Sequence, residues 1–309
     1  MKTAFLFPGQ GAQTPGMGAD LYNHSDIYRQ TFDLCEASAE LDLKAACFEG
    51  TGLDGSEMIQ PAIFAHTVSL LKAIQAKGIH ADIYAGLSLG EYSALCAAGV
   101  ISPEQGARLV RKRGAIMDGA IPPGEGGMLS VIGFTAEQVE EVIKAYPEVY
   151  LANHLSEQQT VLGGRMENLS SVKDAMEQAG AKMVTFLAVK GPSHCPLLND
   201  AAAQFAAELD KTALSAINGT VYSNALGAPY PPDADIRALL CEQMRARVRW
   251  HDSVERMLTD GVTRFVEVGP GNVLAKLLKR RAGKAASVES IRDAATLDAF
   301  LRECGEEDR

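Results

Sequence analysis

Apolar residues recur along the first third of the chain with two periods, one typical of strands and one of helices. KTAFLF at 2–7 is a buried-strand pattern that ends in the turn PGQG, and DIYAGL at 82–87 predicts a second strand. Residues 60–78 have helical spacing and end at Gly78, and GEYSALCAAG at 90–99 predicts the next helix. Strands that alternate with helices in this way indicate a parallel sheet with helices on both faces.

A further helix is predicted over 103–117 by its capping residues. Ser102 precedes Pro103, and Gln105 follows Ser102 at the spacing of a capping box. This helix ends before the Pro/Gly-rich segment IPPGEGG at 121–127, which we interpret as a hinge.

The order of elements changes after this hinge. The pattern predicts strand, helix, two strands, helix and strand, which is the βαββαβ order of a ferredoxin-like unit complete by about Val189. Alternation of helices and strands then resumes to the end of the chain. We therefore expect an α/β fold with a large domain over 1–121 and 190–309 and an inserted small domain over 122–189.

Composition restricts the class of protein. The chain has 309 residues, a net charge of −10 and a pI near 5.2, which argues against a nucleic-acid partner. No apolar stretch is long enough to span a bilayer, and MKTAFLF is interrupted too early for a signal peptide. The six cysteines form no CxxC pair and no zinc-spaced cluster. We expect reduced thiols, a cytoplasmic location, no metal and no membrane association.

Ser88 is the first candidate for chemistry. It is the central residue of GLSLG, a G-x-S-x-G pattern between a predicted strand and a predicted helix, as in a nucleophile elbow. Glycines permit such a strained turn, and the backbone N–H of Leu89 would be one oxyanion donor. The alternative is an ordinary strand-to-helix turn that uses small residues.

The segment PGQGAQTPGMG after the first strand does not have dinucleotide-loop spacing, because Thr14 occupies the third glycine position. Gln10 would instead face the same sheet edge as Ser88, where its amide could donate a hydrogen bond or position a substrate.

Among the six histidines, His194 lies in the rigid turn KGPSHCP at the junction of the two expected domains. A rigid turn between domains suits a general base, so we favour His194 over His154.

Arg113 differs from the other basic residues of the helix over 103–117. Its neighbours three and four positions away are Leu109, Val110, Ile116 and Met117, so it projects from the apolar stripe. A buried guanidinium must be paired. It could form a structural ion pair with a core carboxylate, or bind the carboxylate of a substrate through two hydrogen bonds.

Five segments, taken in order, resemble one family. They are similar to segments of the malonyl-CoA:acyl-carrier-protein transacylases of fatty acid synthesis. The five segments are FLFPGQGAQTPGMG, GLSLGEYSALCAAGVIS, RLVRKRG, PSHC and FVEVGPG. The resemblance implies an α/β-hydrolase-like large domain with an inserted ferredoxin-like domain. It implies Ser88 as the acylated nucleophile, His194 as its base and Arg113 as the clasp of the malonyl carboxylate. Gln10 and the Leu89 amide would form the oxyanion site, and Gln60 and Asn153 would lie near the pocket.

Two positions depart from the family pattern. Leu87 replaces a histidine that usually precedes the nucleophile, which puts the efficiency of the reaction in doubt. Arg249, in VRW at 248–250, replaces a glutamine, and we expect its backbone carbonyl to orient the histidine as that glutamine does in the family.

The resemblance predicts malonyl-CoA and phosphopantetheinylated acyl carrier protein as partners, no cofactor, a ping-pong reaction and, as oligomeric state, a monomer. Carrier proteins of this kind are acidic, so the basic run KLLKRRAGK at 276–284 could dock them, although a solvated helix end would have the same sequence. Three alternatives stay open: an acyltransferase of polyketide synthesis, a serine hydrolase or thioesterase, and an inactive scaffold.

Overall fold

A computed structural model describes residues 1–307. Contacts between residues divide the chain into two compact units. The first unit contains Met1–Gly114, Thr212–Tyr222 and the chain from Arg256 onward, and the second contains Ala115–Lys211 and Ser223–Glu255. The second unit thus includes the expected insertion over 122–189 and three further segments, 115–121, 190–211 and 223–255.

The first unit contains a parallel sheet. Its strands follow the order β10-β9-β1-β2-β7, and their bounds are β1 (Thr3–Phe7), β2 (Ile83–Gly86), β7 (Thr220–Ser223), β9 (Arg264–Val268) and β10 (Ser287–Ile291). β1 lies between β2 and β9, and from Ala4 to Phe7 it is buried. The apolar run at 2–7 is therefore confirmed as a central strand.

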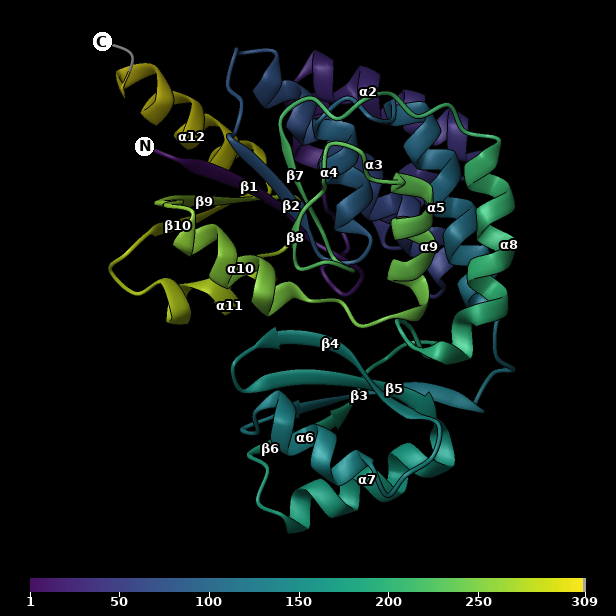
Figure 1. The fold of residues 1–309 in the computed structure, drawn as a ribbon. Helices are drawn as coiled ribbons and strands as arrows, with labels where there is room; N and C mark the ends of the chain where they lie inside the picture. The colour runs from purple at the N-terminus through teal and green to yellow at the C-terminus, as the bar shows by residue number, and fades with distance from the viewer. Residues whose placement is uncertain (308–309) are drawn as a thin grey trace. The chain divides into compact units, whose positions relative to one another are not determined.

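Helices lie on both sides of this sheet, as Figure 1 shows for α12 on one side and α11 on the other. The helices of the first unit are α1 (Ala19–His24), α2 (Asp26–Ala39), the π-helix η1 (Ala45–Glu49), α3 (Ser56–Gln75), α4 (Gly90–Ala97), α5 (Pro103–Asp118, which continues into the second unit), α11 (Val273–Ala282) and α12 (Ala294–Glu307). The helix predicted over 103–117 is confirmed with its capping box, because Ser102 and Gln105 exchange backbone and side-chain hydrogen bonds. α3 begins four residues before the predicted start at 60, after the extended Gly55.

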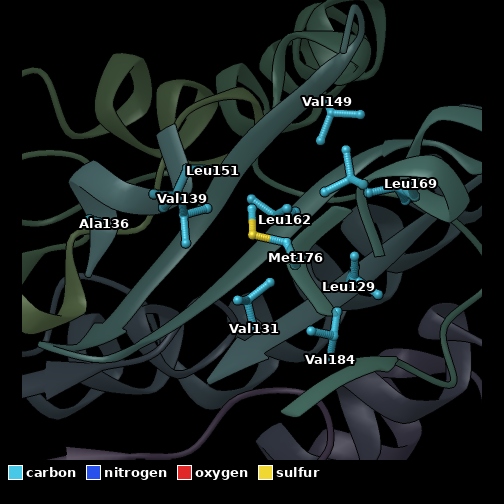
Figure 2. Packing of buried hydrophobic residues seen from close by; sticks show 11 residues of the cluster. Leu129, Val131, Ala136, Val139, Val149, Leu151, Leu162, Leu169, Met176 and Val184 are labelled. Atoms are coloured by element: carbon cyan, nitrogen blue, oxygen red, sulfur yellow. The ribbon is translucent and has the colours of Figure 1, made fainter. Parts of the chain in front are cut away.

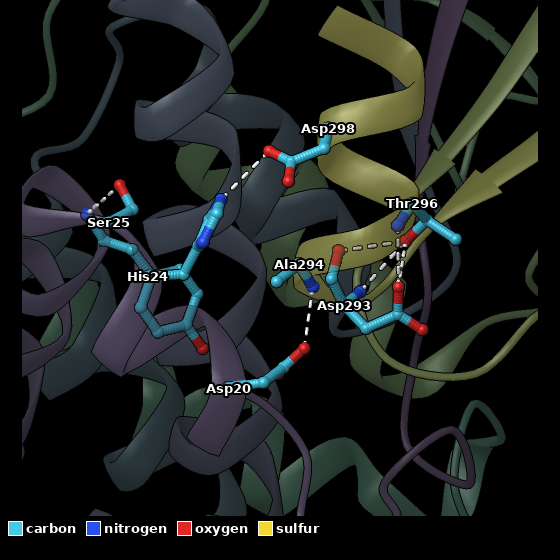
Figure 3. Close-up of polar contacts among 8 residues, drawn as sticks. Asp20, His24, Ser25, Asp293, Ala294, Thr296 and Asp298 are labelled. Carbon is cyan, nitrogen blue, oxygen red and sulfur yellow. Dashed lines mark hydrogen bonds and ion pairs between the residues drawn. The ribbon is translucent and has the colours of Figure 1, made fainter.

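α1 and α12, which are far apart in the sequence, contact each other in the first unit (Figure 3). Asp20 accepts a hydrogen bond from the backbone N–H of Ala294, the first residue of α12, at 2.7 Å. His24 Nε2 lies 2.9 Å from an Asp298 carboxylate oxygen. A carboxylate at a helix N-terminus satisfies an otherwise unpaired N–H and interacts favourably with the helix dipole, so these contacts fix α12 against α1.

The second unit contains a four-stranded antiparallel sheet in the order β4-β5-β3-β6. Its strands and two helices are β3 (Gly126–Ile132), α6 (Ala136–Ile143), β4 (Val149–Ser156), β5 (Gln159–Arg165), α7 (Met166–Gln178) and β6 (Met183–Phe186). This is the predicted βαββαβ order, and the predicted fold class is confirmed. One core joins the sheet to the helices, with Leu162 and Met176 at its centre (Figure 2).

The rest of the second unit is mainly helical. It consists of the 3-10 turn η2 (Pro196–Leu198), α8 (Asn199–Asp210), the short strand β8 (Ala228–Pro229), α9 (Ile236–Arg245) and the first part of α10 (Trp250–Thr259). Among the helices of residues 1–307, none combines the length and apolar character needed to cross a membrane. All six cysteines are free thiols.

His66 in α3 is fully buried, and this gives the fold a pH dependence. Its Nδ1 lies 2.7 Å from the hydroxyl of Tyr28, and burial lowers its pKa from 6.5 to about 4. The unfolded chain therefore binds one more proton than the folded chain as the pH falls from about 6.5 to about 4. This difference should destabilise the fold by on the order of 3 kcal/mol over that interval.

We expect His66→Gln to remove this contribution, so that its free energy of unfolding decreases less than that of the wild type between pH 7 and pH 4.5. Urea unfolding at the two pH values measures the difference, with Tyr28→Phe as a control that retains the histidine. Equal decreases in the wild type and His66→Gln would contradict the prediction.

Candidate active site

Ser88 occupies a strained turn between β2 and α4. Its φ is 53°, in the left-handed region that non-glycine residues seldom adopt. A Cβ on Gly86 would lie 2.0 Å from backbone atoms of Gly90, and a Cβ on Gly90 would lie 2.0 Å from the carbonyl oxygen of Phe7. The two glycines of GLSLG are thus required by close backbone contacts, which is the steric reason for the elbow pattern.

Arg113 points its guanidinium group at this serine. The residue is 1% exposed, and its Nη2 donates to Ser88 Oγ at 3.1 Å. Its Nη1 donates to Gln60 Oε1 at 2.8 Å, and the guanidinium carbon lies 5.4 Å from the centre of the Tyr92 ring. Burial lowers the pKa of Arg113 below its usual value. The predicted burial of Arg113 is confirmed, and Gln60, which was expected near the pocket, contacts it directly.

A close helix crossing places Gln60 beside Arg113. A Cβ on Gly114 would lie 2.2 Å from the carbonyl oxygen of Ser56 in α3, and one on Gly106 would lie 2.1 Å from the Phe64 ring. Glycine at these two positions of α5 lets its backbone approach α3 more closely than any side chain would permit. Arg113 precedes Gly114, so its side chain starts next to the N-terminal turn of α3.

Gln10 extends the network of side-chain hydrogen bonds that connects Ser88, Arg113 and Gln60. Gln60 Nε2 donates to Gln10 Oε1 at 3.5 Å, and Gln10 Nε2 donates to Ser56 Oγ at 3.3 Å. Both ends of the Gln10 side-chain amide are thus engaged by neighbouring side chains. Sequence reasoning missed Ser56, because a serine at the start of a helix looks like an ordinary capping residue.

The backbone of Gln10 offers a better donor than its side chain. Gly9 brings this turn against the elbow, since a Cβ there would lie 2.6 Å from the carbonyl oxygen of Leu87. Within residues 1–307, neither the Gln10 N–H nor the Leu89 N–H donates to another group of the chain. Two unused N–H groups on adjacent turns, one of them at the start of α4, are the elements of an anion-binding site.

In the second unit, His194 is held by the end of α9. Its Nδ1 lies 2.6 Å from the carbonyl oxygen of Gln243, and its backbone N–H donates to the carbonyl oxygen of Met244 at 3.0 Å. A carbonyl only accepts, so Nδ1 carries the proton and Nε2 is the basic nitrogen. His194 is 4% exposed and has a left-handed φ of 58°. This ring is fixed in the tautomer that a general base needs.

The prediction that Arg249 orients the histidine is wrong, because Gln243 supplies that carbonyl. The Arg249 carbonyl accepts from the backbone N–H of Ser253 instead, and its half-exposed side chain pairs with Asp252. Gln243 is fully buried and lies three residues after the buried Leu240. The helical spacing that singled out Arg113 would also have singled out Gln243 as a polar residue in an apolar stripe.

Asn153 and His154 lie next to each other on β4. The Asn153 Oδ1 atom is buried and has no hydrogen-bond partner in the part of the chain that the structure describes. The His154 ring lies 4.6 Å from that of His251, and its Nδ1 lies 3.8 Å from an Asp252 carboxylate oxygen. Burial, followed by the charge of His251, lowers the pKa of His154. His194, whose tautomer is fixed by a carbonyl, is the better candidate for a base.

No group of three or more histidine, cysteine, aspartate or glutamate side chains in residues 1–307 is arranged to hold a metal ion. The chemistry that the described residues can supply is nucleophilic and acid–base. A strained serine beside a buried cation, with two N–H donors nearby, defines a site for acyl transfer from substrates that carry a negative charge.

Comparison with known proteins agrees with this class. Residues 4–305 match the family model described as the acyl transferase domain, so the chain belongs to the acyl transferases. It is 35% identical to the malonyl CoA-acyl carrier protein transacylase of Bacillus subtilis, over 99% of this chain and 98% of that protein. It therefore belongs to the malonyl-CoA:acyl-carrier-protein transacylase family.

Solved structures and a further relative extend the likeness. The crystal structure of the transacylase from Clostridium perfringens superposes with a TM-score of 0.94 at 35% identity, covering 100% of this chain and 98% of that one. PlMCAT, solved in complex with the type II polyketide acyl-carrier protein AntF, gives a TM-score of 0.90 at 35% identity, covering 98% and 100%. The polyketide biosynthesis transacylase BaeC of Bacillus velezensis is 37% identical over 89% of this chain and 95% of that protein.

Proposed function

We propose that this protein transfers malonyl groups from malonyl-CoA to the phosphopantetheine thiol of an acyl carrier protein, through an ester on Ser88. The observation that carries the proposal is the hydrogen bond of 3.1 Å from Arg113 Nη2 to Ser88 Oγ. It places a fixed positive charge next to the atom that would receive the acyl group. A malonyl ester has a free carboxylate a few bonds away from that oxygen, where a guanidinium fork can bind it.

The proposed reaction has two halves with the same groups. His194 Nε2 takes the Ser88 proton as Oγ attacks the thioester carbonyl, the C–S bond breaks, and the leaving sulfur takes the proton from His194. The carrier thiol then attacks the ester, gives its proton to His194, and the serine hydroxyl is restored. The N–H groups of Gln10 and Leu89 would stabilise the oxyanion in both halves. No cofactor or metal takes part.

We place this reaction in fatty acid synthesis and in the cytoplasm. Transfer to a polyketide carrier protein is the second candidate, supported by the 37% identity to BaeC. The chemistry at Ser88 would be the same for either carrier. Rates measured side by side with a fatty-acid carrier and a polyketide carrier would separate the two.

Intact-mass spectrometry after exposure to malonyl-CoA tests the proposal. We expect an adduct of one malonyl group that peptide mapping locates on Ser88 and that disappears when holo-carrier protein is added. Rapid release of free malonate without a persistent adduct would indicate a hydrolase instead. Absence of any reaction would indicate a scaffold.

A cluster of exposed basic residues on α11 is the proposed docking surface for the carrier. The cluster consists of the exposed Lys276, Lys279 and Arg280 of α11 and of the exposed Lys284 just after the helix. Within residues 1–307 none of these four forms an ion pair. A chain with a net charge of −10 would otherwise repel an acidic partner.

Charge reversal at Lys279, Arg280 and Arg281 should raise the KM for the carrier roughly tenfold or more, because rim charges steer association. The rate at which malonyl-CoA acylates Ser88 should stay unchanged. Steady-state kinetics at varied carrier concentration measures the first quantity, and rapid-quench mass spectrometry measures the second. An unaltered KM would exclude α11 as the docking surface.

A further inference from the structure

An open pocket of about 440 Å³ in the second unit is lined by two arginines and by His194. It is bounded by Glu242 and Arg245 at the C-terminal end of α9, by Arg247 just after this helix, by Tyr150 of β4 and by Asn199 at the start of α8. We call it the arginine pocket. Met244, whose carbonyl accepts the His194 N–H, immediately precedes Arg245. The pocket is therefore connected to the proposed base through adjacent residues.

Both guanidinium groups retain hydrogen-bonding capacity. Arg245 pairs with Glu242 on its own helix, and Arg247 pairs with Glu140 of α6. The side chains are 47% and 32% exposed, and partly exposed ion pairs of this kind contribute little to stability. Each guanidinium has five N–H donors, so one carboxylate leaves several of them for another anion. Phosphate matches this fork well, because its oxygens, like those of a carboxylate, accept two parallel hydrogen bonds.

We propose that the arginine pocket binds the phosphate at the far end of the pantetheine arm. This inference rests on the proposed function. Coenzyme A and the carrier protein both present their thiol on a pantetheine arm whose other end is a phosphate ester. The thiol end must reach His194, which lines the pocket, and the arm must extend away from it. Tyr150 and Leu151 supply an apolar wall for the arm, and Arg245 and Arg247 supply its phosphate partners.

The test compares thioesters with and without the phosphate. In the double variant Arg245→Gln/Arg247→Gln, kcat/KM for malonyl-CoA should fall roughly ten- to a hundredfold, the effect of losing charge-assisted hydrogen bonds. For malonyl-pantetheine, which carries the same thioester but no phosphate, kcat/KM should stay within about twofold of the wild type, given the range of a neutral surface substitution. Arg237→Gln is the matched control, because Arg237 lies on the same helix, is 38% exposed and does not line the pocket.

The outcomes separate three conclusions. A fall with malonyl-CoA, with the holo-carrier, or with both supports the proposal, and the pattern shows which phosphate the pocket binds. An equal fall with malonyl-pantetheine would mean that the substitutions disturb His194, and unchanged rates with both phosphorylated partners would mean that the arm lies elsewhere. Either result overturns the proposal. If the wild-type protein takes malonyl from none of these thioesters, the proposed function itself fails.

Discussion

Replacing Ser88 by alanine should abolish the malonyl adduct and lower the transfer rate by at least about four orders of magnitude, as removal of a nucleophile does in related triads. The substitution deletes the only atom of this residue that can form the ester. It leaves the backbone turn in place, because alanine tolerates the left-handed conformation of residue 88 no worse than serine does. Intact-mass spectrometry and a transfer assay would measure the two effects.

Ser69→Ala is a suitable control for the Ser88 substitution. Ser69 is a buried serine of the same unit whose hydroxyl has no hydrogen-bond partner among the described residues. Removing its hydroxyl should leave both the adduct and the rate unchanged. An adduct that persists in Ser88→Ala would place the nucleophile elsewhere and would reject the proposed mechanism.

Arg113→Ala should lower kcat/KM for malonyl-CoA by roughly a thousandfold while leaving acetyl-CoA turnover unchanged or higher. In the wild type, an acetyl group would leave the buried charge of the guanidinium without the carboxylate it is proposed to bind, and a buried charge without a counter-charge is costly. Removing the guanidinium removes that penalty together with the malonyl contact. Competition between the two thioesters, followed by the mass of the adduct, measures the change in selectivity.

Arg108→Ala provides the matched control on the same helix, since Arg108 is exposed. Arg113→Lys should recover only part of the malonyl rate, because an ammonium group does not reproduce the bidentate fork. If Arg113→Ala lowered the malonyl and acetyl rates equally, Arg113 would support the elbow structurally and the assignment of malonyl as substrate would lose its basis.

Much of the fold could be predicted because the apolar periods are strong and uninterrupted. The alternating strands and helices, the capping box at Ser102 and the βαββαβ order all follow from local patterns, and all are observed. The grouping of residues 190–211 and 223–255 with the small sheet was not predictable in this way. It depends on contacts such as the backbone hydrogen bonds of Val248 with Ala152 and His154 of β4, which are distant in sequence from Val248 and leave no periodic signal.

The site shows the same division. Ser88 and Arg113 have local signatures, a glycine-flanked turn and an apolar helical stripe, and the structure brings their side chains together at 3.1 Å. Helical spacing marks Gln243 as a buried position, but its role as the orienting carbonyl has no local signature, because every residue carries a carbonyl and only tertiary structure selects one. The backbone N–H of Gln10 has no local signature either. The sequence pattern singled out the side-chain amide of Gln10 instead.

The position of β1 between β2 and β9 constrains how the protein is made. The turn that carries Gln10 follows β1. One neighbour of β1, the strand β2, ends at Gly86, and the other, the strand β9, begins only at Arg264. Most of the polypeptide must therefore be synthesised before the sheet next to the Ser88 turn can close, whereas the antiparallel sheet of residues 126–186 is complete much earlier. Pairings so distant along the chain form slowly, so we expect the parallel sheet to be completed only when synthesis is nearly finished.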